Sequence, residues 1–223
     1  MKAMILAAGR GERMRPLTDT TPKPLLPLQG RPMLEHHLER LARAGFRDVL
    51  INTAWLGEQF PQTLGDGRRF GLAIHYQHET QALETGGGIQ RALSWLGPDP
   101  FLVVNGDVYC ELEFNALPQL GQQDLAHLWL VANPAHNSQG DFALNQGRVQ
   151  AQGEAKLTFS GIGLYRPELF ARCAPGRFPL APLLREAMAQ GRVGGTALEG
   201  HWCDVGTEQR LIELEQRLNA NLG

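Results

Sequence analysis

Cysteine and long apolar segments are scarce in this sequence. Only three cysteines occur among 223 residues, at Cys110, Cys173 and Cys203, and no two of them form a C-x-x-C pair. An odd number of scattered thiols does not predict a disulfide framework, and reduced thiols indicate a cytoplasmic protein. No segment approaches the ~18 apolar residues of a transmembrane helix, and the apolar run over residues 3–8 is too short for a signal peptide. We therefore expect no membrane association.

An excess of charge of either sign is also lacking. The 21 basic and 23 acidic residues give a net charge of −2, which excludes a general affinity for nucleic acid or anionic membrane. The basic residues are nevertheless concentrated in one short segment, which holds Arg10, Arg13, Arg15 and Lys23 but only two acids. This local asymmetry indicates a binding site for a specific anion.

Apolar periodicity alternates between strand-like and helix-like segments, which predicts an α/β fold with a mixed, mostly parallel Rossmann-like sheet flanked by helices. In the first half we expect strands over 2–7, 48–52, 72–76 and 101–104, and helices over 33–44, 58–64 and 86–96. In the second half we expect strands over 125–131, 158–165 and 192–198, a hairpin over 142–152, and helices over 180–189 and 208–218. Ligands of such sheets bind at the carboxyl ends of the strands.

The segment after the first predicted strand, LAAGRGERMRPLTDTTPKPLL over residues 6–26, has the composition of a phosphate-binding loop. Gly9 and Gly11 let the backbone turn sharply and approach a ligand closely, and successive amides in such a turn attract anions. Arg13 adds a forked donor that suits phosphate oxygens. Lys23 stands between two prolines that restrict its backbone, and a fixed ammonium suits negative charge developing on phosphorus.

Two other glycine-rich loops compete for this segment. A dinucleotide-binding fingerprint, as in an NAD-dependent oxidoreductase, requires a third glycine at position 14, where Met14 stands. A Walker A loop requires Gly-Lys-Ser/Thr at its end, which is also missing. A lone G-x-G would be explained better by a flexible surface loop. The full run of strand, glycines, arginine and Pro-Lys-Pro is more specific.

Two acids stand where a metal site could form. Asp107 follows a predicted strand in the run Asn105-Gly106-Asp107, and Asp204 stands in HWCDVGT over residues 201–207. Each has an ordinary structural explanation, Asp107 as a turn residue and Asp204 as a helix cap, although Thr207 is the more natural cap. Magnesium is bound by one or two carboxylates together with substrate phosphates. The two aspartates, facing the arginine–lysine loop, therefore predict a Mg²⁺ site.

The first loop resembles the signature of the sugar-1-phosphate nucleotidyltransferases, G-x-G-x-R-x-x-P-L-T-x-x-x-P-K-P-L-L. The W-x-D-V-G-T run around Asp204 matches a second motif of that family. The resemblance extends from Met1 to about Leu214 and implies one nucleotidyltransferase domain over residues 1–223. Residues 1–110 would form its nucleotide-binding half, and residues 111–223 a mixed sugar-binding half that completes the metal site. It implies Arg13, Lys23, Asp107 and Asp204 as the catalytic residues.

The resemblance also implies binding residues for the nucleotide. Residues 78–88, HETQALETGGG, resemble a run close to H-E-x-x-x-L-G-T-A-G that lines the nucleobase slot, but Glu84 replaces its glycine. If that position requires a positive φ, Glu84 is strained. The glycines here could instead be a plain helix entry. The implied nucleotide-binding residues are Ala8, Gly9, Gly11, Glu12, Arg13, Lys23, Glu79, Glu84 and Thr85.

For the sugar, the resemblance implies Asn105, Gly140, Glu154, Ser160 and Gly161. Glu154 is followed by Ala155 and Lys156, so the family's E-K-P form is not kept, and Ser160-Gly161 stands where Asn-Ala-Gly is common. These departures indicate a sugar other than plain glucose. A solvated charge in a hairpin explains Glu154 equally well.

Four stretches, HHLERLARAGF, NTAWLGEQF, LETGGG and TFSGIGLYRPELF, resemble the short uridylyltransferases of bacterial cell-wall recycling. This resemblance implies UTP and N-acetylmuramic acid 1-phosphate as substrates and a role in peptidoglycan recycling. It also implies that the C-terminal repeat domain of bifunctional acetyltransferase relatives is lacking. Thymidylyl or guanylyl transfer to glucose or mannose 1-phosphate is the alternative activity. A non-catalytic nucleotide-sugar-sensing subunit is a further alternative. Such a subunit is expected to have lost Lys23 or one of the two aspartates, but all three residues are present here.

Overall fold

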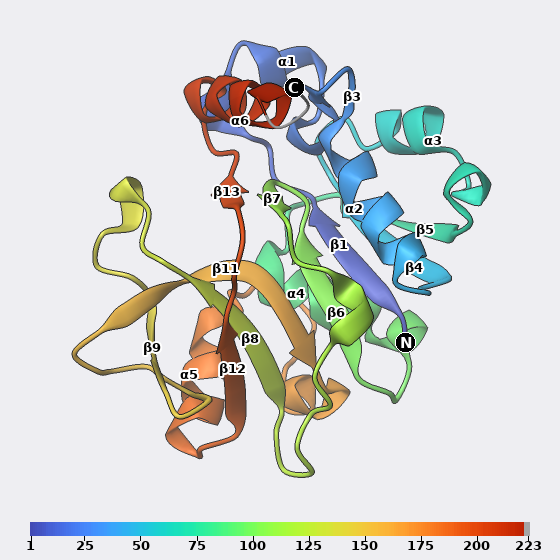
Figure 1. Cartoon of the computed structure of the whole chain (residues 1–223). Coiled ribbons are helices and arrows are strands. Elements are labelled where there is room, and N and C mark those ends of the chain that lie inside the picture. The colour runs from blue at the N-terminus through green and yellow to red at the C-terminus, as the bar shows by residue number, and fades with distance from the viewer. Residues whose placement is uncertain (221–223) are drawn as a thin grey trace.

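The computed structural model, which describes residues 1–220, is built on one nine-stranded sheet with the order β5-β4-β1-β6-β11-β8-β12-β10-β9 (Figure 1). Four parallel strands make up one side of the sheet: β1 (Ala3–Ala7), β4 (Asp48–Thr53), β5 (Ala73–His78) and β6 (Phe101–Asn105). All of them come from the first half of the chain. Their carboxyl ends therefore lie at one edge of the sheet, where the first loop begins.

Successive residues of β1 face two separate hydrophobic layers, as expected for a strand buried on both faces. Ala3 and Ile5 pack in the layer that contains α2 (Met33–Arg43) and α3 (Gln59–Leu64). Met4 packs in the layer that contains α4 (Glu84–Leu96) and α5 (Ala181–Ala189). Helices therefore cover both faces of the sheet, as the periodicity predicted.

The other side of the sheet contains β8 (Ala126–Val131), β9 (Phe142–Asn145), β10 (Arg148–Gln150), β11 (Lys156–Tyr165) and β12 (Val193–Ala197). The long strand β11 pairs antiparallel with both β6 and β8, and so connects the two sides. Only β8 and β12 pair in parallel here. The sheet is mixed, and its parallel part is concentrated in the first half of the chain.

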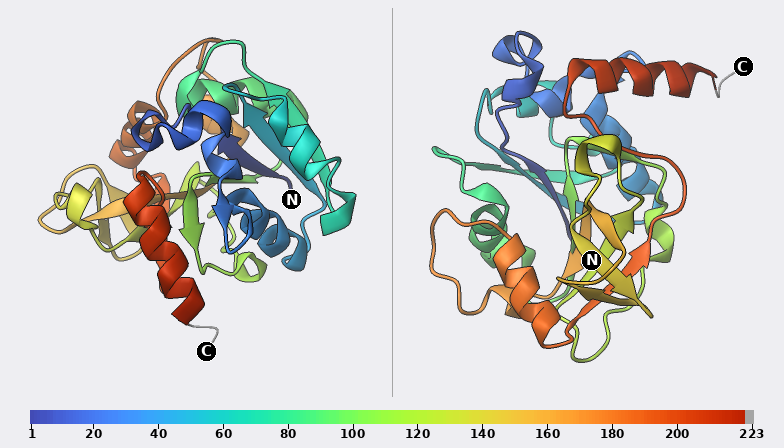
Figure 2. Two further views of the ribbon diagram at one scale, coloured as in Figure 1. Left: turned by 90° about the horizontal axis from the view of Figure 1, so that it is seen from above. Right: turned by 90° about the vertical axis from the view of Figure 1, so that its left-hand side faces the viewer.

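A third hydrophobic cluster joins the last helix to the first loop. Leu211 and Leu214 of α6 (Glu208–Ala220) share this cluster with Met14, Leu28 and Met33. Figure 2 shows α6 lying across the loop region from residues 12 to 33, at the end of the sheet where the parallel strands terminate. The packing fixes the segment before α6, which contains Asp204, beside the first loop.

The predicted helices and strands all occur, with boundaries within two residues of those expected. The short elements were missed: α1 (Leu17–Thr20), the pair β2 (Pro27–Leu28) and β3 (Arg31–Pro32), and the pair β7 (Val108–Cys110) and β13 (Trp202–Asp204). A strand of two or three residues has no measurable alternation of apolar and polar positions. Among residues 1–220, no helix has the length and apolar character needed to cross a membrane.

Candidate active site

A cavity of about 520 Å³ opens at the carboxyl ends of β1, β4 and β6. It brings together all nine residues of the predicted nucleotide site with the first of the two predicted metal ligands. Its lining consists of Leu6, Ala7, Ala8, Gly9, Arg10, Gly11, Glu12, Arg13, Lys23, Pro24, Asn52, Glu79, Ala82, Glu84, Thr85, Asn105, Asp107 and Gly206. The site thus lies where open α/β sheets bind their ligands.

The first loop folds back on itself at Gly11, which has a φ of 70°. A Cβ at this position would lie 3.0 Å from Cγ2 of Thr18 and 3.1 Å from Cβ of Lys23. Thr18 closes the loop by donating its hydroxyl hydrogen to the Gly11 carbonyl at 2.8 Å. Gly9 has no left-handed backbone and no chain atom within 4 Å of a Cβ built there. Only Gly11 therefore has a left-handed backbone in this loop, and Gly9 leaves open space in the cavity.

Lys23 begins a single 3₁₀ turn, Lys23–Leu25, and is only 6% exposed. Its Nζ donates a hydrogen bond of 2.6 Å to Oδ2 of Asp107. An ammonium held this way loses little conformational entropy when it meets a ligand, because its position is already fixed. The structure thus brings a fixed cation and a carboxylate into contact in the same cavity.

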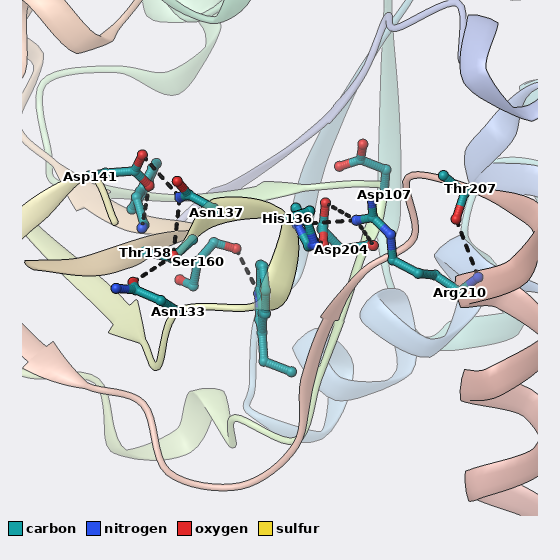
Figure 3. A network of polar contacts seen from close by, with 12 residues as sticks. Asp107, Asn133, His136, Asn137, Asp141, Thr158, Ser160, Asp204, Thr207 and Arg210 are labelled. Carbon is teal, nitrogen blue, oxygen red and sulfur yellow. Dashed lines mark hydrogen bonds and ion pairs between the residues drawn. The ribbon is translucent and has the colours of Figure 1, made fainter. Parts of the chain in front are cut away.

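Asp107 and Asp204 become neighbours through the antiparallel pairing of β7 with β13. In that ladder Asp204 lies opposite Val108, and the backbone N–H of Val205 donates to the Asp107 carbonyl at 2.8 Å. Figure 3 shows the two carboxylates on the same side of the β13 segment. Asp204 itself lines an adjoining cavity of about 480 Å³, while Gly206 lines the nucleotide cavity.

The chemistry of these donors suits Mg²⁺. Two carboxylates supply part of an oxygen coordination sphere and leave other positions for phosphate and water, as magnesium requires. Among the described residues no group of three or more His, Cys, Asp or Glu side chains is assembled. Asp107 and Asp204 are therefore the residues that could hold a magnesium ion.

Glu79 forms one wall of the cavity and is 2% exposed. Its Oε1 accepts from Nδ2 of Asn52 at 2.7 Å, and its Oε2 accepts from the Leu83 amide at 2.9 Å. Asn52 in turn accepts the Ala7 amide at 2.9 Å through Oδ1. Asn52 was missed in the sequence, although a polar residue near the carboxyl end of a buried strand was a usable signal.

Glu84 begins α4 with a φ of 60°, so the residue that replaces the family's glycine retains a left-handed backbone. Its side chain lines the cavity and pairs with Nε of Arg177 at 2.8 Å. The strain expected for a non-glycine residue at a positive φ is therefore present. Glu84 also moves the start of the helix two residues ahead of the predicted 86–96.

The three glycines after Thr85 are required for packing. A Cβ at Gly86 would lie 2.5 Å from the Phe178 ring, and one at Gly87 would lie 2.1 Å from the Gly176 carbonyl oxygen. A Cβ at Gly88 would lie 3.0 Å from Oε1 of Glu79. They allow the chain around residues 176–178 to cross the first turn of α4, while Thr85 and Glu84 line the cavity.

The residues predicted for the sugar separate into two groups. Asn105 lines the cavity, and Gly161, with a φ of 79°, packs so closely that a Cβ would lie 2.6 Å from Nδ2 of Asn105. Ser160 is fully buried, and its hydroxyl oxygen accepts from the Ile162 amide at 3.2 Å. Ser160 lies in the stretch of β11 where the register with β8 shifts, and contact of its hydroxyl with sugar stays a prediction.

Gly140 and Glu154 do not line the cavity. Gly140 has a φ of 62°, and a Cβ there would lie 2.8 Å from Oδ1 of Asn133 and from the backbone of Lys156. Glu154 is exposed in the turn between β10 and β11. The backbone thus accounts for Gly140 without a ligand, and contact of either residue with sugar stays a prediction.

Burial sets the protonation of two groups beside the aspartates. Burial lowers the pKa of His37 to about 4, and Nε2 of this neutral ring lies 2.6 Å from the Val108 carbonyl. Burial raises the pKa of Cys203 to about 11, with the Asp204 charge adding to the effect. A thiolate nucleophile is therefore disfavoured here. The chemistry of the site rests on cations, carboxylates and backbone amides.

The family model for nucleotidyl transferases matches residues 2–140, which include the first loop, Glu79, Glu84 and Asp107. The chain therefore belongs to the nucleotidyl transferase family. It is 54% identical to the N-acetylmuramate alpha-1-phosphate uridylyltransferase of Neisseria meningitidis, over 96% of this chain and 97% of that protein. It is 34% identical to the enzyme of the same name from Caulobacter vibrioides, over 97% of this chain and 96% of that protein.

Solved structures share the fold. The crystal structure of a Bacillus anthracis protein, named as a candidate glucose-1-phosphate thymidylyltransferase, superposes with a TM-score of 0.85 at 22% identity, covering 97% of this chain and 94% of that one. HddC from Yersinia pseudotuberculosis superposes with a TM-score of 0.81 at 18% identity, covering 97% and 99%. The α/β nucleotidyltransferase fold predicted from the sequence is confirmed.

Proposed function

We propose that this chain transfers the uridylyl group of UTP to N-acetylmuramic acid 1-phosphate, giving a UDP-sugar and pyrophosphate. The observation that carries the proposal is the single cavity in which the Gly11 turn, Arg13, Lys23 and Asp107 meet. The 54% identity to a relative named for this reaction supports the choice of nucleotide and sugar. The reaction would return a cell-wall sugar to its nucleotide-activated form in the cytoplasm, the role in peptidoglycan recycling that the sequence resemblance implies.

The reaction needs no protein nucleophile. An oxygen of the sugar 1-phosphate is already ionised at neutral pH and attacks the α-phosphorus of UTP. A new P–O bond forms as the bond from the α-phosphorus to the bridging oxygen of pyrophosphate breaks, and the electron pair leaves with pyrophosphate. The protein's contribution is to position the two phosphates and to neutralise the charge that develops between them.

Different residues of the cavity would bind the different parts of the two substrates. The amides around Gly11 and the guanidinium of Arg13 would hold the β- and γ-phosphates. Lys23 would contact the α-phosphate or the incoming sugar phosphate, since its Nζ is fixed 2.6 Å from Oδ2 of Asp107. Asp107 and Asp204 would hold Mg²⁺, which neutralises phosphate charge when bound. Glu79, Glu84 and Thr85 would line the nucleobase end of the cavity.

The test is pyrophosphate release from UTP and Mg²⁺ with N-acetylmuramic acid 1-phosphate, beside glucose and N-acetylglucosamine 1-phosphates. The wild type is compared with Asp107→Asn, a variant, expected to be inactive, that keeps the shape of the side chain and removes its charge. We expect selective turnover of the muramic substrate by the wild type and loss of turnover in the variant. Turnover only with thymidine or guanosine triphosphate, or with another sugar phosphate, would reject the proposed substrates. No turnover with any pair would favour a nucleotide-sugar-sensing subunit.

A further inference from the structure

The Asp204 carboxylate is occupied by basic side chains of the chain itself. Nη1 of Arg210, in the first turn of α6, donates to Oδ2 of Asp204 at 2.6 Å and to its backbone carbonyl at 3.0 Å. Nε2 of His136 lies 3.0 Å from Oδ1. With Lys23 on Asp107, three of the four carboxylate oxygens that could bind a cation therefore face nitrogen atoms of basic side chains, and Nη1 of Arg210 also lies 3.2 Å from Nε2 of His136.

His136 is held in this position by its own loop. Nδ2 of the next residue, Asn137, donates to Thr158 at 3.1 Å and to Asp141 at 3.2 Å (Figure 3). These bonds anchor the 3₁₀ turn Ala135–Asn137 to β11 and direct His136 toward Asp204. Arg210 is fixed from the other side, where its backbone N–H donates to the hydroxyl of Thr207 at 3.3 Å.

Arg210 also lies next to Arg13. A Cβ built on Gly206 would be 3.1 Å from Nη2 of Arg13 and 3.1 Å from both Nη1 and Nη2 of Arg210, so the two guanidiniums converge on this glycine. Like charges so close repel each other, and an anion between them would be attracted to both. Among residues 1–220, neither Nε nor Nη2 of Arg210 has a hydrogen-bond partner. Two donors of Arg210 are thus available for a phosphate oxygen.

We infer that Arg210 is a positioning residue that competes with the divalent cation for Asp204, and that it is drawn from the carboxylate by nucleotide phosphate. A guanidinium at 2.6 Å opposes a second cation on the same oxygen by direct charge repulsion. Phosphates that reach Arg13 offer Arg210 an alternative anion and free Asp204. Bound nucleotide then raises the affinity of the protein for the cation, and bound cation raises the affinity of the protein for the nucleotide by the same factor.

This inference rests on the proposed function for its metal site, and it can be tested without turnover. Binding of Mn²⁺ alone to the full chain is measured by electron paramagnetic resonance, for the wild type, Arg210→Met and Arg217→Met. Arg217 lines the same cavity of about 480 Å³ and has no hydrogen bond or ion pair among residues 1–220, so its substitution removes an equal charge without touching Asp204. We expect Arg210→Met to bind Mn²⁺ about tenfold more tightly than either other protein.

A second titration tests the phosphate half of the inference. Binding of UTP in EDTA is measured by calorimetry, and Arg210→Met is expected to bind about tenfold more weakly than wild type, because it lacks a charge-assisted phosphate contact. Arg210→Lys keeps the charge and should stay close to wild type in both titrations. His136→Ala provides a second test if Arg210→Met fails to fold, because His136 lies in an exposed turn. This substitution frees Oδ1 of Asp204 and should tighten Mn²⁺ binding.

The outcomes separate the inference from the proposed function. If Arg210→Met and His136→Ala bind Mn²⁺ no more tightly than wild type, competition for Asp204 is wrong, although the enzyme can still transfer uridylyl groups. If UTP binding is unchanged in Arg210→Met, the transfer of Arg210 to phosphate is wrong. If Asp204→Asn binds Mn²⁺ as wild type does, Asp204 is not a ligand, and the proposed metal site fails together with the inference.

Discussion

The backbone N–H of Val205 donates a hydrogen bond of 2.8 Å to the carbonyl of Asp107. This bond extends the short β7–β13 ladder and joins the end of the nucleotide-binding strands to the segment that enters α6. Because the backbone sets the spacing, the two aspartates are positioned before any ligand arrives. Asp204 and Gly206 therefore lie beside Asp107 and the nucleotide cavity although the family match ends at residue 140.

Replacing Lys23 by methionine tests the role of the fixed ammonium. The change removes the charge held against Asp107 but keeps an unbranched side chain for its buried stem. We expect kcat for uridylyl transfer to fall by about 10²-fold or more, as when one preorganised donor is lost. The measurement is steady-state pyrophosphate release at saturating UTP. Lys2→Met, at the opposite end of β1, is the charge-matched control and should keep near-normal turnover. Normal turnover of Lys23→Met would remove Lys23 from catalysis.

Gly11→Ala separates backbone strain from displacement of Lys23. Gly11 and Gly147 have φ values of 70° and 75°, so alanine at either position costs roughly 1–2 kcal/mol of stability. Only at Gly11 does the new methyl meet neighbours, at 3.0 Å from Cγ2 of Thr18 and 3.1 Å from Cβ of Lys23, whereas nothing lies within 4 Å at Gly147. We expect Gly11→Ala to lose at least as much free energy of unfolding as Gly147→Ala, and kcat to fall only in Gly11→Ala. Equal activity would show that the loop tolerates the displacement.

His37 makes stability depend on pH. Burial lowers its pKa from 6.5 to about 4, aided by Arg40 and His36 and opposed by the Val108 carbonyl and Asp107. Between pH 6.5 and about 4, His37 is protonated in the unfolded chain but neutral in the folded protein. The contribution of neutral His37 to the free energy of unfolding is therefore complete above pH 6.5 and is lost as the pH falls toward 4. Protonation would also place a charge on Nδ1, which is buried without a partner among the described residues.

The change that tests this dependence is His37→Gln, which can still donate toward the Val108 carbonyl but does not titrate. Urea unfolding of both proteins from pH 8 to pH 4.5 is the measurement. The stability advantage of the wild type should shrink as pH falls below 6.5, by up to about 3 kcal/mol from the size of the pKa change. Parallel stability curves across this range would show that His37 does not titrate with folding.

The sequence predicted the parts of the site that follow long, strongly patterned strands. Asp107 follows such a strand, Lys23 was singled out by the Pro-Lys-Pro run in the loop after the first strand, and the structure brings the two into contact. It did not predict Asn52 or Arg210, because each acts through a specific side-chain partner: Asn52 through Glu79 on a separate segment, and Arg210 through Asp204, which the turn before α6 brings beside it. Contacts of this kind depend on tertiary packing and leave no local periodicity.

The sugar side was harder to predict, because its key feature is a strand irregularity. A one-residue difference in register turns a side chain from one face of a sheet to the other. Ser160 is buried within the stretch where the register shifts between Phe159 and Gly163, and Gly161, which has a left-handed backbone, packs against Asn105. The residues 158–165 were correctly predicted as a strand, but the bulge within it was not.

Glu84→Gly restores the residue that the family has at this position, and it tests whether the contact with Arg177 shapes the nucleotide site. Removing a side chain at a φ of 60° relieves about 1 kcal/mol of backbone strain, which offsets the loss of an exposed ion pair of similar or smaller value. Stability should therefore change little. The KM for UTP should rise several-fold with kcat nearly unchanged, because the Glu84–Arg177 pair holds the segment at 176–178 across the start of α4.

The double variant decides whether that pair is the cause. If Glu84 acts through Arg177, then Arg177→Met should raise the KM for UTP by a similar factor, and combining it with Glu84→Gly should add little further change. Gln146→Gly, which relieves a φ of 48° in the turn between β9 and β10, controls for backbone strain away from the cavity and should leave KM unchanged. Additive effects of the two substitutions would mean that Glu84 contacts the nucleotide independently of Arg177, and its carboxylate rather than the ion pair would then set the affinity for UTP.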